Sequence, residues 1–189
     1  MGNSFINMKH LFYLSILLCA YGCIGPQESF KAEKYFSIDS LVVAQIALLK
    51  SNQNALTKTV QIGENIETQS FSADAIDWES ELKIFSLLEL NKSKFVGSID
   101  TKTDLKSTSY LPKKDALMSI KFLKITKDKS QLTTIDGYYL DDDAKVIYTS
   151  QRNLKMNFNK GLLTSFEIAG TQKVLFTDTT QFMINGTIN

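Results

Sequence analysis

The sequence predicts an α+β domain in which two N-terminal helices pack on a long, curved antiparallel β-sheet. Two segments near the start, 38–50 and 74–89, place apolar residues at helical spacing. From Lys94 to Asn189 apolar and polar residues alternate instead, and turn residues interrupt the alternation at regular intervals. No helical pattern separates these strands, which favours hairpins over parallel crossover units. The sheet is therefore expected to be a meander, curved as far as a half-barrel.

The first helix is expected over 38–50, because polar residues able to cap free amides come just before a single apolar stripe. A hairpin should follow, with strands over 56–62 and 66–71 and a turn at Gly63 to Asn65. Helix and hairpin are expected to lie close together, since only a short polar segment separates them.

The second helix is expected to begin at Asp74, whose side chain can accept hydrogen bonds from free amides. Asp77 and Glu79 fall in its first turn, where the helix dipole favours anions. Trp78 and Phe85 then share one face with two leucines. This helix should therefore pack its tryptophan inward.

The rest of the chain is expected to be strands joined by polar turns. The expected strands are 95–104, 105–111, 117–125, 132–140, 145–158, 162–169, 173–176 and 181–188. The expected turns among them include 127–129, 141–143, 159–161 and 169–171.

Residues 1–22 are interpreted as an export signal that is removed from the mature protein. The apolar run from Leu11 to Ala20 follows Lys9 and is too short to cross a bilayer as a helix. Met8 is a second possible start, because residues 1–7 add nothing that such a signal needs.

Small residues precede the cysteine at the end of this segment, Ala20-Tyr21-Gly22-Cys23, and the pattern resembles the lipobox of bacterial lipoproteins. The resemblance implies that Cys23 is the acylation site and that 23–34 tether a single domain, 35–189, to a membrane. Acyl chains contribute about 0.8 kcal/mol per buried CH₂, so several of them give a durable anchor. Ile24 resembles what outer-membrane-directed lipoproteins carry, and this resemblance implies a domain on the outer membrane facing the periplasm, with the inner membrane as the alternative. The alternative is a secreted protein with an incidental cysteine.

Composition excludes several classes of function. With 43% apolar and 22% charged residues in 189, the chain is an ordinary globular protein. Lys9 is the only Lys, Arg, Asp or Glu in residues 1–22, so its removal takes the net charge from +1 to zero and leaves no basic surface for nucleic acid. The same cleavage removes the only histidine, His10, and leaves Cys23 as the single cysteine. Histidine-dependent hydrolases, and metal sites built from imidazole or thiolate, are therefore not expected.

Two helices followed by a long antiparallel sheet resemble the half-barrel of the LolA/LolB-like family of lipoprotein carriers and receptors. The resemblance covers roughly residues 35–188 and rests on the order of the elements. It implies a curved sheet wrapped around the helices.

Three polar features remain as candidates for chemistry. Asp141, Asp142 and Asp143 could hold calcium, but three acids between apolar strands favour a solvated turn. The acids around Glu79 favour a solvated helix start over a catalytic pair. Arg152 could bind a phosphate or carboxylate, but the preferred interpretation is a surface residue that discourages edge pairing.

The aromatic residues are the remaining candidates for a binding site. Trp78, Phe85, Phe122 and Phe158 could line a cavity between helices and sheet, or they could fill the core. The leading prediction is a non-catalytic, membrane-anchored binding module for an apolar ligand or an envelope protein, without metal or cofactor. The alternatives are a structural lipoprotein with a filled core and a glycan-acting enzyme that uses two carboxylates.

Overall fold

The first helix and most of the strands follow the capping and periodicity of the sequence, but the second helix begins at Trp78 and is capped by Asp77, not by Asp74. The computed structural model describes residues 35–141 and 148–189. Cys23, Asp142 and Asp143 lie outside these residues. The elements, in chain order, are α2 Ile38–Ser51, β1 Leu56–Ile62, β2 Asn65–Phe71, the 3₁₀ turn η2 Ala73–Ala75, α3 Trp78–Leu82, the 3₁₀ helix η3 Lys83–Leu88, the 3₁₀ turn η4 Ser93–Phe95, β3 Ile99–Thr103, β4 Ser107–Pro112, β5 Ile120–Asp128, β6 Gln131–Asp141, β7 Tyr148–Asn159, β8 Leu162–Val174 and β9 Thr180–Ile188.

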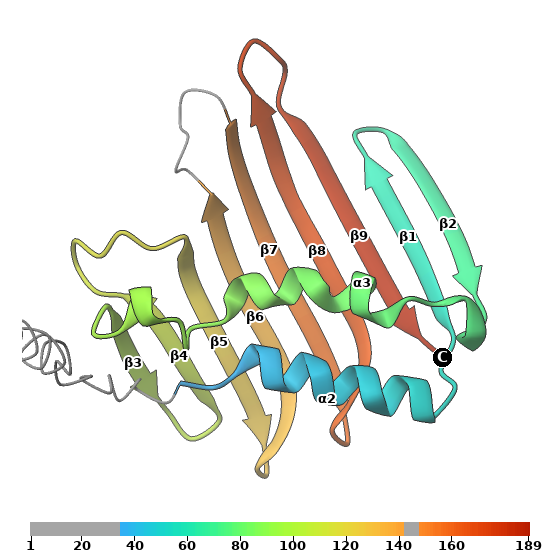
Figure 1. The fold of residues 1–189 in the computed structure, drawn as a ribbon, viewed down its shortest axis with the longest axis horizontal. Coiled ribbons are helices and arrows are strands. Elements are labelled where there is room, and N and C mark those ends of the chain that lie inside the picture. The colour runs from blue at the N-terminus through green and yellow to red at the C-terminus, as the bar shows by residue number, and fades with distance from the viewer. Residues whose placement is uncertain (1–34, 142–147) are drawn as a thin grey trace, which may run out of the picture. The chain divides into compact units, whose positions relative to one another are not determined.

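All strands in the described residues belong to one nine-stranded antiparallel sheet, in the order β2-β1-β9-β8-β7-β6-β5-β4-β3. Strands β3 to β9 form a meander, and the early hairpin β1–β2 is added beside the last strand (Figure 1). Backbone hydrogen bonds in both directions between Ala55 and Asn189, each 3.0 Å, continue that pairing past the ends of β1 and β9. The predicted α+β class with a curved antiparallel sheet is confirmed, and the sheet is open.

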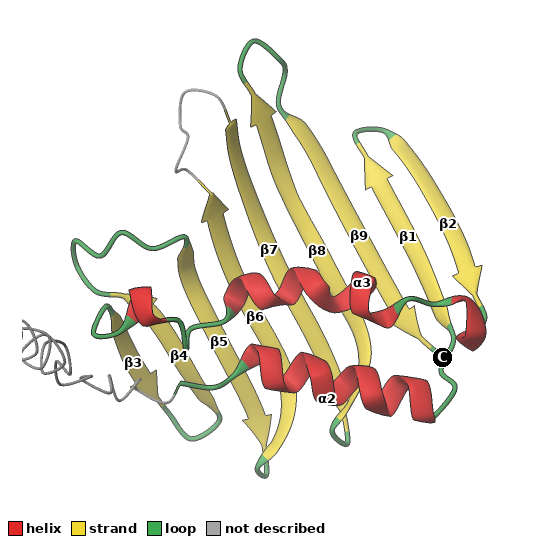
Figure 2. Cartoon of the chain, in the orientation of Figure 1, coloured by secondary structure: helices red, strands yellow, loops and turns green. Residues whose placement is uncertain are grey.

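The helical segments cross one face of the sheet and leave the far ends of several strands uncovered (Figure 2). Helix α2 packs against α3 and η3, and this layer contacts strands β5, β6 and β8. The core between layer and sheet includes Trp78, Phe85 and Phe166, each at most 2% exposed. The rings of Phe85 and Phe166 meet edge to face at 6.1 Å. No helix among the described residues is both long enough and apolar enough to cross a membrane.

The second helical segment is shorter in its α form than the sequence predicts. Its α-helix α3 ends at Leu82 and continues as the 3₁₀ helix η3. A 3₁₀ helix has three residues per turn, so Leu82, Phe85 and Leu88 fall on a single side and are all buried. The spacing of the buried residues explains the tighter winding.

The turn predicted at 169–171 is wrong, and so is the separate strand at 173–176. Residues 162–174 form one long strand, in which Gly170 is paired with Arg152 on one side and Phe182 on the other. The glycine is a turn signal in the sequence, yet here it allows close packing, because an added Cβ would overlap the backbone carbonyl oxygen of Gln151 and would lie 3.1 Å from Cζ of Phe182.

Two buried polar side chains fasten α2 to the rest of the domain. The Gln45 amide donates to the Gly161 carbonyl at 2.9 Å and accepts from the Leu163 amide at 2.8 Å, which joins α2 to the β7–β8 turn. The Glu89 carboxylate accepts from the Asp39 amide at 2.9 Å and so covers the N-terminus of α2. These contacts hold α2 against the β7–β8 turn and against the segment that follows η3.

Candidate functional groove

The helices leave one end of the sheet face beneath them uncovered. The pairing of the strands shows which side chains lie there. Residues directly opposite each other on antiparallel strands share a face. One row across β7, β8 and β9 contains Leu154, Ile168 and Ile184, and the next contains Arg152, Gly170 and Phe182. Phe166, two residues before Ile168 on β8, packs against Phe85 of η3, so both rows face the same side as the helices.

A groove of about 520 Å³ lies where these rows emerge beside α3 and η3. Its apolar lining consists of Ile84, Ile168, Phe182 and Ile184. Its polar lining consists of Lys58, Ser80, Glu81, Arg152 and Gln172. The groove thus has an aliphatic and aromatic floor with charged groups at its borders.

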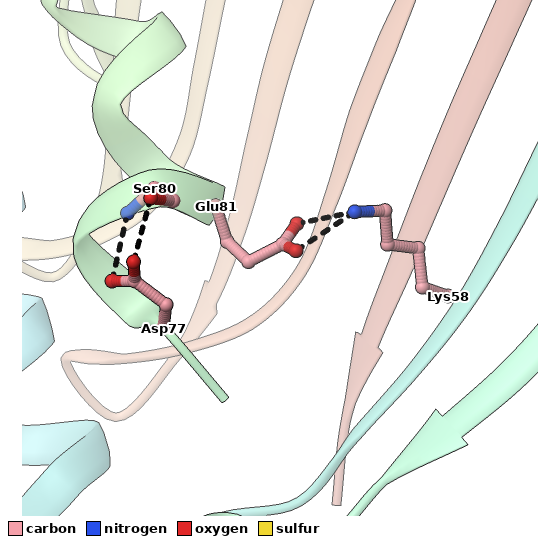
Figure 3. Close-up of polar contacts among 4 residues, drawn as sticks. All are labelled: Lys58, Asp77, Ser80 and Glu81. Carbon is pink, nitrogen blue, oxygen red and sulfur yellow. Dashed lines mark hydrogen bonds and ion pairs between the residues drawn. The ribbon is translucent and has the colours of Figure 1, made fainter. Parts of the chain in front are cut away.

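An ion pair forms one border of the groove. Lys58 Nζ on β1 lies 2.8 Å from both carboxylate oxygens of Glu81 on α3 (Figure 3). The helix turn that presents Glu81 is itself capped, because Asp77 accepts hydrogen bonds from the Ser80 amide at 3.2 Å and the Ser80 hydroxyl at 2.7 Å. These bonds to Ser80 hold the pKa of Asp77 below its usual value. Lys58 and Glu81 therefore neutralise each other at this border.

Arg152 lies at the groove without such a partner. Its guanidinium donates one long hydrogen bond, 3.5 Å, to the Tyr148 hydroxyl. Across the described ranges 35–141 and 148–189, no carboxylate lies within ion-pair distance of it. The preferred sequence interpretation, a residue that protects a sheet edge, is wrong, because β7 is paired with β6 on one side and β8 on the other.

A buried hydroxyl lies two positions before Arg152. Ser150 is completely buried on the same side of β7, and its Oγ has no hydrogen-bond partner within the part of the chain that the structure describes. Gln172, a groove residue, is paired directly with Ser150 on β8. This end of the helix-facing surface is therefore polar, in contrast to the row of Leu154, Ile168 and Ile184.

None of the four aromatic residues proposed from the sequence lines the groove. Trp78, Phe85 and Phe158 are buried in the core. Phe122 is paired with Tyr138 and is only half-buried. Its neighbour Leu123 is paired with Gly137, which faces Leu88 of η3, so Leu123 points towards the helices. Successive side chains of a strand point to opposite faces, and Phe122 therefore points away from the helices.

The groove residues themselves carry a weak sequence signal. Ala169 follows Ile168, and Met183 separates Phe182 from Ile184, so the polar alternation around these residues is incomplete. The sequence also does not show that the helices stop short of them. Finding the groove from sequence would have required the strand register and the length of the helical layer.

The acidic residues singled out from the sequence do not form a metal site in the described residues. Asp141, at the end of β6, is partly exposed, and no cluster of three or more histidine, cysteine, aspartate or glutamate side chains with metal-binding geometry occurs in 35–141 or 148–189. In the groove lining as described, Glu81 is the one carboxylate, whereas a paired-carboxylate mechanism requires two.

Comparison with known proteins adds no assignment, since no family model, curated protein or solved structure matches this chain.

Proposed function

We propose that this domain is a non-catalytic binding module that holds the apolar part of a small ligand in the groove beside α3. The observation that carries the proposal is the apolar floor, where Ile84, Phe182 and Ile184 stay partly exposed at a concave surface. Small-molecule sites are typically concave, largely apolar and about 300–1,000 Å³ in volume, and the groove falls within that range.

We also propose that the chain is a lipoprotein acylated at Cys23 and held at the bacterial outer membrane, facing the periplasm. The support is the Ala20-Tyr21-Gly22-Cys23 pattern after a short apolar segment. Metabolic labelling with an alkyne fatty acid in a bacterial host tests this. The wild-type chain should incorporate label and Cys23→Ala should not, whereas equal labelling of both would contradict the proposal.

The second candidate is a structural lipoprotein that acts through its outer surface. Two observations favour it: the layer between helices and sheet is filled by large buried side chains, and Ile62, Ile66 and Phe176 are strongly exposed at hairpin ends. This candidate predicts that the groove stays empty and that envelope proteins are the only partners.

Binding of a fluorescent polyene fatty acid distinguishes the two. A chain from Gln27 to Asn189 retains every residue of the described core and omits the apolar segment from Leu11 to Ala20, which could bind lipid by itself. Ile184→Trp should fill the groove and weaken binding by about tenfold or more, the equivalent of 1.4 kcal/mol. Met183→Trp is the matched control, since the side chain of the neighbouring residue points to the other face of β9.

Thermal unfolding of both variants shows whether they fold. If Ile184→Trp does not fold, Ile84→Trp on η3 tests the same groove from its other wall. Absence of any saturable binding by the unsubstituted chain would reject the binding-module proposal and favour the structural role.

A further inference from the structure

The formal charges of the described residues that line the groove do not cancel. The lining contains two cations, Lys58 and Arg152, and one described carboxylate, Glu81. Glu81 is engaged by Lys58 through both oxygens at 2.8 Å, so the positive charge of Arg152 is left over. The nearest acidic residue in the pairing, Asp141, lies opposite Ser150 on β6 and forms no ion pair with Arg152.

Arg152 lies where its positive charge would attract an anion. The guanidinium is half-buried beside an apolar floor, where an anion would be attracted more strongly than at an open surface. A guanidinium also presents a planar fork of donors that matches the two oxygens of a carboxylate or phosphate. Among the described residues, the guanidinium donates one hydrogen bond, the long one to the Tyr148 hydroxyl.

Gln172, which lines the groove, adds hydrogen-bonding capacity at this end. Its partner on β7, Ser150, is completely buried and lies outside the groove lining. On the other side of Arg152, the row with Ile168 and Ile184 is apolar. Adjacent rows on one face are two residues, or about 7 Å, apart. One bound molecule can therefore contact both the polar and the apolar row.

We propose that the groove takes a single-chain amphiphile with an anionic head, its carboxylate or phosphate paired with Arg152 and its chain over Ile168 and Ile184. The inference rests on the proposed binding function and specifies the class of ligand. The charged head determines orientation and selectivity, whereas the apolar chain supplies the hydrophobic contribution.

The test compares three 16-carbon probes that differ in the head alone: hexadecanoate, the lysophosphatidic acid with the same chain, and neutral hexadecanol. Each displaces the fluorescent polyene fatty acid from the chain Gln27 to Asn189, at concentrations below the micelle-forming or solubility limit of that probe. The unsubstituted protein should bind at least one anionic probe about tenfold or more tightly than hexadecanol. The preferred anion then identifies whether a fatty acid or a phosphate lipid is the source of the head.

Variants of Arg152 separate charge from packing. Arg152→Gln should abolish the anionic preference while hexadecanol affinity stays within about twofold, and Arg152→Lys should retain part of it. Lys155→Gln is the matched control, because Lys155 is an exposed cation on the other face of the same strand, and it should leave all three affinities unchanged.

The outcomes are distinct. Binding of all three probes with equal affinity, or an anionic preference that survives Arg152→Gln, overturns this inference while the binding-module function stands. Failure of every probe to bind overturns the proposed function itself.

Discussion

Lys58 on the first strand and Glu81 on the short helix α3 form an ion pair in which one ammonium contacts both carboxylate oxygens at 2.8 Å. The two residues are 23 positions apart in the chain, and the pair joins the β1–β2 hairpin side of the sheet to the helical layer. It also neutralises the only carboxylate at the groove as described, which leaves Arg152 uncompensated.

This ion pair should be measurable as a modest coupling. The Lys58 and Glu81 side chains are 24% and 21% exposed, so water weakens their attraction, and a double-mutant cycle with Lys58→Met and Glu81→Gln should give about 0.5–1 kcal/mol in urea unfolding. Glu81→Gln alone should also strengthen binding of hexadecanoate, because it frees a second cation at the groove. A coupling of zero together with unchanged binding would show that the ion pair neither stabilises the fold nor neutralises the groove.

Gln45 should be essential for stability. Its amide pairs with Gly161 and Leu163, so Gln45→Leu leaves the Leu163 amide, buried beneath α2, without a partner. We expect a loss of about 1–3 kcal/mol in chemical unfolding. Ala47→Gln, at an exposed position of the same helix, should change stability by less than about 0.5 kcal/mol. Equal effects of the two substitutions would contradict the assigned role.

Glu89 should contribute stability only while it is ionised. Burial acts to raise its pKa, but hydrogen bonds from Asp39, Asn91 and Ser37 outweigh burial and hold the pKa below its usual 4.5. A lowered pKa means that the stabilisation is complete above about pH 4.5 and is lost as the pH falls through the folded-state value.

Glu89→Gln should therefore destabilise the protein at pH 7, by about 1–3 kcal/mol, because one side of the amide would direct a donor at groups that are themselves donors. The difference from the unsubstituted protein should shrink when unfolding is measured at pH 3. Other carboxylates with lowered pKa, including Asp77 and Asp104, are common to both proteins and cancel in the difference. A difference that does not depend on pH would show that the charge of Glu89 is irrelevant.

Gly186 should tolerate no side chain while Phe166 is present. Phe166 on β8 is paired with Gly186 on β9, and a Cβ on Gly186 would overlap the Phe166 ring. Gly186→Ala should cost about 1–3 kcal/mol in thermal or urea unfolding. The cost should be smaller in a Phe166→Leu background, where the ring is gone. Additive effects of the two substitutions would contradict the contact.

Local signals in the sequence predict the first third of the described fold well. The capping residue Ser37 and the apolar stripe place helix α2 within one residue of its observed end, and Gly63, with a φ of +59°, forms the expected hairpin turn. These features depend on residues close together in the chain, which is why they can be recognised without tertiary information.

The errors arise where distant packing decides the structure. Gly170 carries the same turn signal as Gly63 but is held in the middle of β8 by pairing on both sides. The expected strand at 95–104 begins only at Ile99, because a 3₁₀ turn and Gly97, with a φ of +74°, come first. The sequence does not predict the groove, because its residues come from four strands and two helical segments. The strand register, which local sequence signals do not reveal, brings these residues together.

The most direct test of the binding account is NMR of the isoleucine methyl groups during titration with hexadecanoate. The methyl groups of Ile84, Ile168 and Ile184, which line the groove, should shift at saturation. The methyl groups of Ile66, which is 62% exposed on the edge strand β2 outside the groove lining, should not shift. Absence of shifts at the three groove residues, or shifts confined to Ile66, would contradict the binding account.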